Sequence, residues 1–271
     1  MGSPGSRTPR SSRSRRRTST TSSGSRTATD AKAPATPERV LRWDGCVNVR
    51  DLGGLPLAGG GETAYRIVVR ADWLPGLSDA GRQALVDYGV SLVVDLRPAR
   101  EHEDDGINPL PVPVVNQGMD PRPLPDAWEW PSMRRAYLAL ADQYRGQLAE
   151  ALTLLGDAEP PAAIHCAGGR DRTGIACGMA LWLAGVEPEV IAADHAMSDE
   201  SWAPHNEGWF AEAPDEQERE RRRRISQPAG RTLAEVLEEI EQREGIRNLL
   251  VGAGADEAAL DRLAARLRGD P

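Results

Sequence analysis

Residues 162–174 read Ala-Ala-Ile-His-Cys-Ala-Gly-Gly-Arg-Asp-Arg-Thr-Gly, and this stretch decides the fold. Its apolar start at 162–164 predicts the end of a buried strand, and the apolar residues after Thr173 predict a helix. A strand, a tight loop and a helix in this order gather backbone N–H groups around one point, and the helix N-terminus adds partial positive charge. The stretch therefore predicts an anion-binding loop at the carboxyl edge of a sheet. Residues 165–174 are called the anion loop below.

The backbone and the cationic side chains of the anion loop suit a phosphate group. Gly168 and Gly169 can take backbone angles that other residues resist, and they let an anion approach the chain closely. Arg172 offers a planar fork for two oxygens of an oxyanion. Arg170 adds a second cation, and the Ala167 side chain is too small to narrow the entrance to the anion loop. These residues are the expected binding residues for an anionic substrate.

Cys166 is the expected nucleophile of the loop. A thiol at a helix N-terminus beside an arginine loses its proton more readily than a free thiol does. We expect His165 to orient the loop through hydrogen bonds and the Thr173 hydroxyl to donate to the thiolate. The other two cysteines, Cys46 and Cys177, belong to no such pattern, and we interpret them as inert buried thiols.

The pattern His-Cys-x5-Arg-Thr-Gly at 165–174 resembles the signature loop of the cysteine-dependent protein tyrosine and dual-specificity phosphatases. The fuller sequence is most similar to a bacterial branch whose loop reads roughly Cys-x-Ala-Gly-Lys-Asp-Arg-Thr-Gly. That branch includes secreted mycobacterial phosphatases that act on phosphotyrosine, phosphoserine/threonine and phosphoinositides. Gly168 and Arg170 replace the usual Ala and Lys, whereas Asp171 is retained. A second segment, 47–54, resembles the Asn-x-Arg-Asp-Leu-Gly-Gly segment near the domain start of the same branch.

The resemblance implies a protein tyrosine phosphatase-like α/β fold. Its mostly parallel sheet of four or five strands is flanked by helices, with a C-terminal helical lid. It also implies hydrolysis of a phosphomonoester, in which Cys166 attacks phosphorus and Arg172 and the loop N–H groups hold the oxygens. Asp171 or Asp95 would be the general acid, and the lack of a separate Trp-Pro-Asp motif favours Asp171. The implied substrates are phosphorylated proteins and phosphoinositides, with no cofactor and no metal.

The rest of the chain predicts the elements around this loop. Ser78 and Gly89 mark the two ends of a helix, and Pro113 limits a strand to a sheet edge. Arg50 and Asp51 are expected to form a structural ion pair. Strands are predicted at 66–72, 91–97 and 112–116, and helices at 79–88, 133–155, 173–184, 188–199, 231–244 and 256–268.

Charge divides the chain into two parts. Residues 1–37 hold eight basic residues against one acidic residue and almost no apolar ones, although the whole chain has a net charge of −8. This composition predicts a disordered basic tail, followed by a phosphatase-like domain at 38–271. Within that domain, the aromatic and then charged stretch 199–230 is interpreted as a lid or a helical insertion.

Three observations bear on compartment and partners. The tail lacks the apolar core of a signal peptide, and no stretch approaches the ~20 apolar residues that span a membrane. Cys166 must also be reduced to act as a nucleophile. We therefore predict a cytoplasmic protein. A solvated tail is favoured over one that binds nucleic acid or anionic lipid, and the four scattered His residues indicate no metal site.

Three other functions fit the same loop. One is an inositol-phosphate phosphatase acting on small molecules, and another is a catalytically silent phosphate-binding module. The third is a sulfur-transfer or arsenate-reducing enzyme. An arsenate-reducing enzyme needs a resolving cysteine, and the nearest candidate is Cys177, eleven residues after Cys166.

Overall fold

One sheet organises the part of the chain that the computed structural model describes, residues 38–102, 109–121 and 133–270. The tail expected over 1–37 lies outside the described residues. The strands are β1 (Arg50–Asp51), β2 (Val68–Ala71), β3 (Leu92–Asp95), β4 (Val114–Asn116) and β5 (Ala162–His165). Their order is β1-β2-β5-β3-β4, with β1 antiparallel to β2 and the other neighbours parallel. The predicted α/β class with a mostly parallel sheet is confirmed.

Strand β5 lies in the middle of the sheet, and every one of its residues is buried. In the register, Ala163 lies beside Val69 of β2 and Val93 of β3. Parallel strands with both faces covered are apolar throughout, which explains the run at 162–164. The chain therefore leaves the centre of the sheet at its carboxyl edge and enters the anion loop there.

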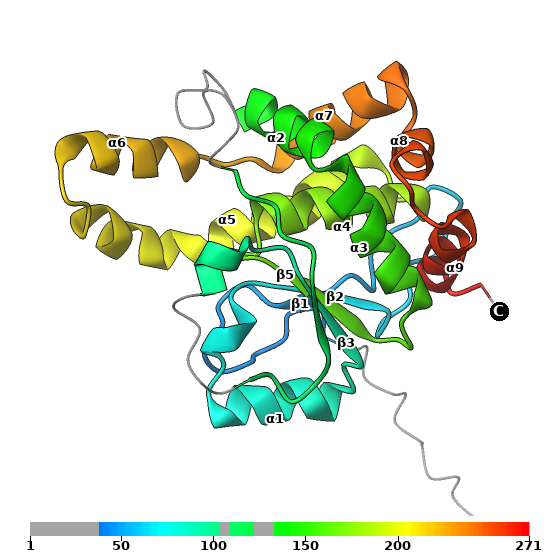
Figure 1. Cartoon of the computed structure of the whole chain (residues 1–271), viewed down its shortest axis with the longest axis horizontal. Coiled ribbons are helices and arrows are strands. Elements are labelled where there is room, and N and C mark those ends of the chain that lie inside the picture. Colours follow the sequence, from blue (N-terminus) through cyan, green and yellow to red (C-terminus); the bar gives the residue numbers. More distant parts are fainter. Residues whose placement is uncertain (1–37, 103–108, 122–132, 271) are drawn as a thin grey trace, which may run out of the picture. The chain divides into compact units, whose positions relative to one another are not determined.

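Nine α-helices surround the sheet in the described residues. They are α1 (Asp79–Tyr88), α2 (Met133–Gln143), α3 (Arg145–Asp157), α4 (Asp171–Leu183), α5 (Pro188–Ala211), α6 (Glu216–Ile225), α7 (Gly230–Arg243), α8 (Ile246–Gly252) and α9 (Glu257–Arg268). Helix α1 covers one face of the sheet, while α3, α4 and α9 lie on the other (Figure 1). Leu85 of α1 belongs to the apolar cluster with Val69 and Val93, whereas Ile175 of α4 belongs to the cluster with Val94.

The ends of α1 follow the sequence prediction. The Ser78 side chain accepts a hydrogen bond from the Gly81 N–H at 3.2 Å, which satisfies a donor of the first turn. Gly89 ends the helix with a φ of 87°, a left-handed conformation that glycine takes without strain. Local signals thus suffice to define this helix.

The single helix predicted at 133–155 is wrong, because the structure breaks it at Tyr144. That residue has φ −111° and ψ 28°, and its hydroxyl donates to the Asp120 carbonyl. Helix α2 packs against α7, whereas α3 packs against α8 and α9. The break at Tyr144 therefore lets α2 and α3 pack in different directions against different helices.

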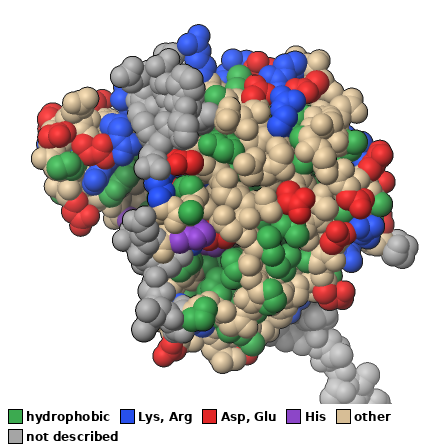
Figure 2. Space-filling model, in the orientation of Figure 1, with side chains coloured by type: hydrophobic (Ala, Val, Ile, Leu, Met, Phe, Trp, Pro, Cys, Tyr) green, Lys and Arg blue, Asp and Glu red, His purple; other side chains and the backbone are tan. Residues whose placement is uncertain are grey.

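The helix predicted to end at 199 is also longer than expected. Helix α5 continues through Pro204 to Ala211, and α6 returns beside it. The end of α5 and α6, residues 199–225, are called the helical hairpin below (Figure 1). No residue of α6 is buried, and Figure 2 shows both signs of charge intermingled on the hairpin. In the described residues, no helix is long and apolar enough to cross a membrane.

Candidate active site

The anion loop is a tight turn between β5 and α4. Cys166 directly follows β5 and is 2% exposed, and α4 begins at Asp171. Gly169 has a φ of 62°, and a Cβ atom there would lie 2.4 Å from the Ala71 carbonyl oxygen. Both the backbone angle and the close approach to β2 therefore require glycine at this position.

The backbone N–H groups of the loop are available to an anion. Throughout the described residues, no protein group accepts a hydrogen bond from the N–H of Gly168, Gly169 or Arg170. The N-terminus of α4 lies directly after these donors. Successive free N–H groups before a helix N-terminus form a cradle for a phosphate or similar oxyanion.

Arg172 is buried at the loop and is held by a carboxylate that the sequence did not indicate. Its terminal nitrogens donate to the two oxygens of Glu101 at 3.0 and 3.2 Å, and one also donates to the Met119 carbonyl at 3.3 Å. Burial opposes the charge of Arg172, but its electrostatic interactions with Cys166 and Glu101 outweigh burial and raise the pKa of the guanidinium. Arg172 is therefore a fixed cation beside the cysteine.

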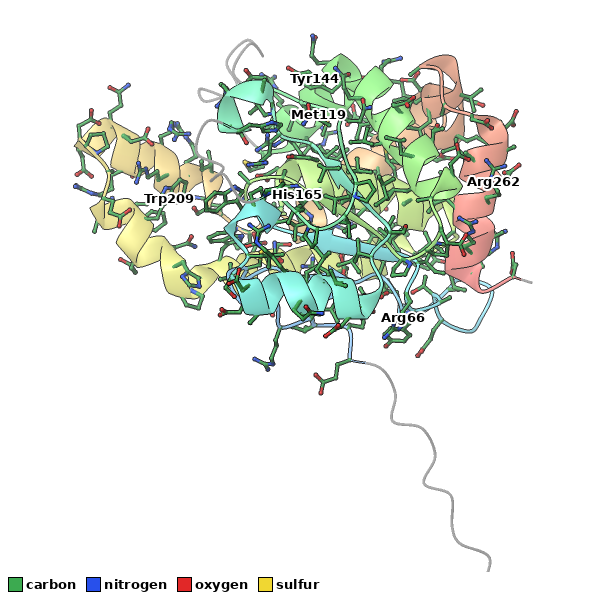
Figure 3. All side chains as sticks on the ribbon, turned by 60° about the horizontal axis from the view of Figure 1, so that its bottom comes forward. Arg66, Met119, Tyr144, His165, Trp209 and Arg262 are labelled. Carbon is green, nitrogen blue, oxygen red and sulfur yellow. The ribbon has the colours of Figure 1, made fainter. Side chains whose placement is uncertain are left out.

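His165 lies at the end of β5, directly before Cys166. Its ring is fully buried, and Nδ1 lies 3.2 Å from the Cys166 carbonyl oxygen. A carbonyl only accepts hydrogen bonds, so Nδ1 carries a proton. The other nitrogen, Nε2, lies 3.5 Å from Oδ2 of Asp95. Figure 3 shows His165 in the interior of the fold, away from Trp209 on the helical hairpin.

Asp95 lies among Arg97 and two histidines. Its Oδ2 accepts from Arg97 at 2.7 Å and lies 3.3 Å from His102 Nε2. Burial opposes ionisation of Asp95, but the nearby His165 ring and the hydrogen bonds and charge of Arg97 outweigh burial and hold the pKa of Asp95 below its usual range. Asp95 thus stays a carboxylate in this arrangement.

Asp171 is the more accessible of the two candidate acids. Its side chain is 40% exposed, and Oδ1 accepts a hydrogen bond from the Tyr137 hydroxyl at 2.6 Å. Tyr137 comes from α2 and is fully buried, and its hydroxyl oxygen lies 3.1 Å from His195 Nε2. The Asp171 carboxyl is therefore oriented at the first turn of α4 while one side faces solvent.

Arg170 turns toward the helical hairpin. Its Nε donates to Asp199 at 2.6 Å, and NH1 donates to the Ile225 carbonyl at 2.6 Å. The remaining terminal nitrogen donates to the Gln227 carbonyl. The second cation expected at the mouth is thus engaged in joining the anion loop to the hairpin.

The remaining predicted residues differ in their surroundings. Ala167 is exposed. The Thr173 hydroxyl is buried and has no hydrogen-bond partner among the described residues, so it does not donate to Cys166 Sγ.

Cys46, Cys166 and Cys177 are all free thiols, and burial raises the pKa of Cys177 to about 11. Within the described ranges, no three His, Cys, Asp or Glu residues gather in a way that would hold a metal ion.

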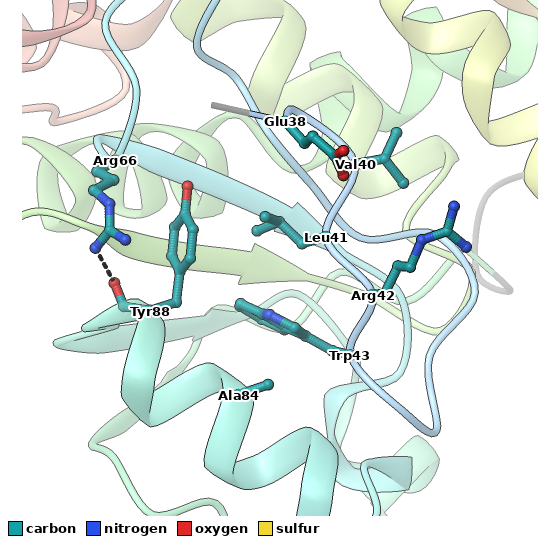
Figure 4. Close-up of a pocket in the computed structure, with 8 residues that line it drawn as sticks. All are labelled: Glu38, Val40, Leu41, Arg42, Trp43, Arg66, Ala84 and Tyr88. Carbon is teal, nitrogen blue, oxygen red and sulfur yellow. Dashed lines mark hydrogen bonds between the residues drawn. The ribbon is translucent and has the colours of Figure 1, made fainter. Parts of the chain in front are cut away.

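A separate hollow of about 420 Å³ lies beside α1 (Figure 4). It is lined by Trp43 and Tyr88, and Arg66 lies over the Tyr88 ring, 4.6 Å from its centroid. Arg66 also donates to the Tyr88 carbonyl at 3.0 Å. None of its lining residues belongs to the anion loop. The hollow therefore lies apart from the anion loop.

The strand order, with a strand–loop–helix unit at its centre, defines a protein tyrosine phosphatase-like fold. Residues 41–269 match the tyrosine phosphatase family, and the chain belongs to that family. A tyrosine-protein phosphatase of Nostoc commune is 31% identical over 140 residues, which cover 48% of this chain and 47% of the relative. The chain thus matches about half the length of that curated relative.

Proposed function

We propose that the protein hydrolyses phosphomonoesters, with phosphotyrosine in proteins as its main substrate, through a phosphocysteine intermediate. The observation that supports this proposal is a buried Cys166 that interacts electrostatically with the buried Arg172, in a loop whose N–H groups at 168–170 have no acceptor among the described residues. Family membership supports phosphatase activity independently of the geometry.

The reaction has two steps. The Cys166 thiolate attacks phosphorus, an S–P bond forms, and the bond from phosphorus to the leaving oxygen breaks. Arg172 and the loop N–H groups stabilise the negative charge of the equatorial oxygens. Water then attacks the phosphocysteine, which releases inorganic phosphate and restores the thiolate.

We assign the general acid to Asp171. Its exposed and oriented carboxyl lies in the loop itself and can take up a proton from solvent between turnovers. Asp95 is less suited, because Arg97 and His165 favour its charged form. Asp171 would protonate the leaving oxygen and then accept a proton from the attacking water.

Hydrolysis of an aryl phosphate by the full chain, with and without EDTA, tests the proposal. We expect turnover that EDTA does not change and that Cys166→Ser abolishes, while the matched variant Cys177→Ser retains it. Turnover that survives Cys166→Ser would overturn the mechanism. A wild-type protein that binds phosphate without any turnover would instead be a silent phosphate-binding module.

The substrate class follows from the surroundings of the loop. A phosphoinositide or an inositol phosphate carries several phosphates and needs a second cation, and Arg170 is engaged with Asp199 and two carbonyls. We therefore favour phosphotyrosine proteins over phosphoinositides. Arsenate reduction is disfavoured, because Cys177 is buried with a raised pKa of about 11. The need for a reduced Cys166 supports a cytoplasmic location.

A further inference from the structure

Three side chains from distant parts of the chain donate hydrogen bonds to two consecutive carbonyls of the anion loop. Asn48 Nδ2 and Trp202 Nε1 both donate to the Gly168 carbonyl, at 2.9 and 2.8 Å. Arg70 donates to the Gly169 carbonyl at 2.9 Å. Asn48 lies just before β1, Arg70 on β2 and Trp202 on the helical hairpin, so three elements converge on this turn.

These bonds fix which way the loop N–H groups point. In a trans peptide unit the carbonyl and the following N–H point in opposite directions. The Gly168 and Gly169 carbonyls point toward the side chains of Asn48, Trp202 and Arg70. The N–H groups of the two residues that follow these carbonyls therefore point the opposite way, into the cradle. Peptide planes next to glycine rotate more easily than those next to other residues. A loop with two glycines therefore needs such external support.

The donors are themselves held firmly. Asn48 is buried, and its Oδ1 accepts from Arg50 at 2.6 Å. Arg50 and Arg70 both pair with the buried Asp194, at 3.0 and 2.7 Å. Trp202 is half-buried on α5. The support thus extends from the anion loop to a buried ionic cluster and to the helical hairpin.

We infer that Asn48 and Trp202, together with Arg70, are positioning residues that hold the anion cradle in its binding conformation before substrate arrives. They touch the loop from its outer side and act through the Gly168 and Gly169 carbonyls. This inference rests on the proposed function, because it assumes that the cradle binds phosphate. It gives the segment at 47–54 a role in catalysis without contact to the reacting atoms.

The test uses protection of Cys166 from iodoacetamide by inorganic phosphate, which reports anion binding without turnover. Trp202→Phe keeps an aromatic ring and removes only the N–H donor. Asn48→Asp keeps the acceptor for Arg50 and removes the donor to Gly168. The matched control is Trp209→Phe, which changes an exposed tryptophan on the same helix.

Each single variant should weaken phosphate binding about two- to tenfold, the range for one neutral hydrogen bond. The double variant should lose more than the product of the two losses, because both donors share one acceptor and only their joint loss frees the peptide. The pH dependence of Cys166 alkylation should also change, because the freed peptides no longer hold the N–H dipoles of the loop in one direction. Trp209→Phe should change neither measurement.

Wild-type phosphate affinity in a folded double variant would overturn the inference. If the buried Asn48→Asp variant fails to fold by circular dichroism, Trp202→Phe alone decides, since its side chain is half-buried. Unchanged protection and an unchanged alkylation profile in Trp202→Phe would then refute the role of Trp202. A wild-type protein that phosphate does not protect at all would instead contradict the proposed function.

Discussion

The carboxylate of Glu101 pairs with both terminal nitrogens of Arg172, at 3.0 and 3.2 Å. Glu101 lies on the short 3-10 helix Ala99–His102 after β3, and Arg172 lies on the first turn of α4. The pair occupies the terminal edge of the guanidinium, while a bidentate oxyanion can still use the edge that carries Nε. Glu101 thus fixes the direction in which Arg172 presents itself to phosphate.

We expect Glu101→Gln to lower kcat/KM for an aryl phosphate about ten- to hundredfold. The reason is the loss of charge-assisted hydrogen bonds, each of about 1.5–3 kcal/mol, that hold Arg172 in place. The matched control is Glu239→Gln, which removes a surface carboxylate paired with Arg134 and should leave kcat/KM unchanged. If Glu101 instead competes with phosphate for Arg172, Glu101→Gln will strengthen inhibition by phosphate. That result would contradict the interpretation that Glu101 holds Arg172 in place for the substrate.

The identity of the acid can be tested through the leaving group. Asp171→Asn should lower kcat/KM strongly for a phosphate ester with a basic leaving oxygen and much less for nitrophenyl phosphate. A general acid matters in proportion to the basicity of the oxygen that it protonates. Asp95→Asn serves as the comparison, and its effect should be similar for both esters. A leaving-group dependence found only in Asp95→Asn would move the assignment to Asp95.

Local sequence signals predicted the elements nearest the site. The apolar run at 162–164 and the glycine pair of the loop predicted the strand and the turn, because both signals are patterns of adjacent residues. Ser78 and Gly89 marked the ends of α1 for the same reason. The predicted edge position of β4, which follows Pro113, is also confirmed.

Contacts between distant residues were not predictable. The ion pair expected between Arg50 and Asp51 is wrong: Arg50 pairs with Asp194, 144 positions away, at 3.0 Å. Asp51 instead accepts from the Gly53 N–H at 2.6 Å and from the Arg66 N–H at 2.9 Å. Glu101 gave no sequence signal beyond its place after a strand end, because its partner Arg172 comes from another part of the chain.

Arg170→Ala should lower turnover of phosphotyrosine peptides and of phosphoinositides by similar factors. Arg170 joins the anion loop to Asp199 and to the end of α6, so its loss loosens the loop for every substrate. Hydrogen exchange of α6 amides should rise at the same time. Arg223→Ala, at an exposed position on α6, is the control and should leave turnover unchanged. A selective loss of phosphoinositide turnover would show that Arg170 leaves Asp199 to hold a second phosphate.

Asp194→Asn should lower the free energy of unfolding at neutral pH by about 3–5 kcal/mol, because it leaves buried guanidinium groups without their counter-charge. Asp194 is fully buried and pairs with Arg50 and Arg70. Burial opposes its ionisation, but the two arginines outweigh burial and hold the pKa of Asp194 below its usual range. A folded pKa below the unfolded value of about 3.9 means that this stability is present above about pH 4 and is lost as pH falls further.

Urea unfolding at pH 7 and at a series of pH values below 4 checks this prediction. The difference in the free energy of unfolding between wild type and Asp194→Asn should narrow on acidification. Asp261→Asn, which removes an exposed carboxylate paired with Arg247, should cost at most about 1 kcal/mol. Equal losses in both variants would contradict a structural role for the buried cluster.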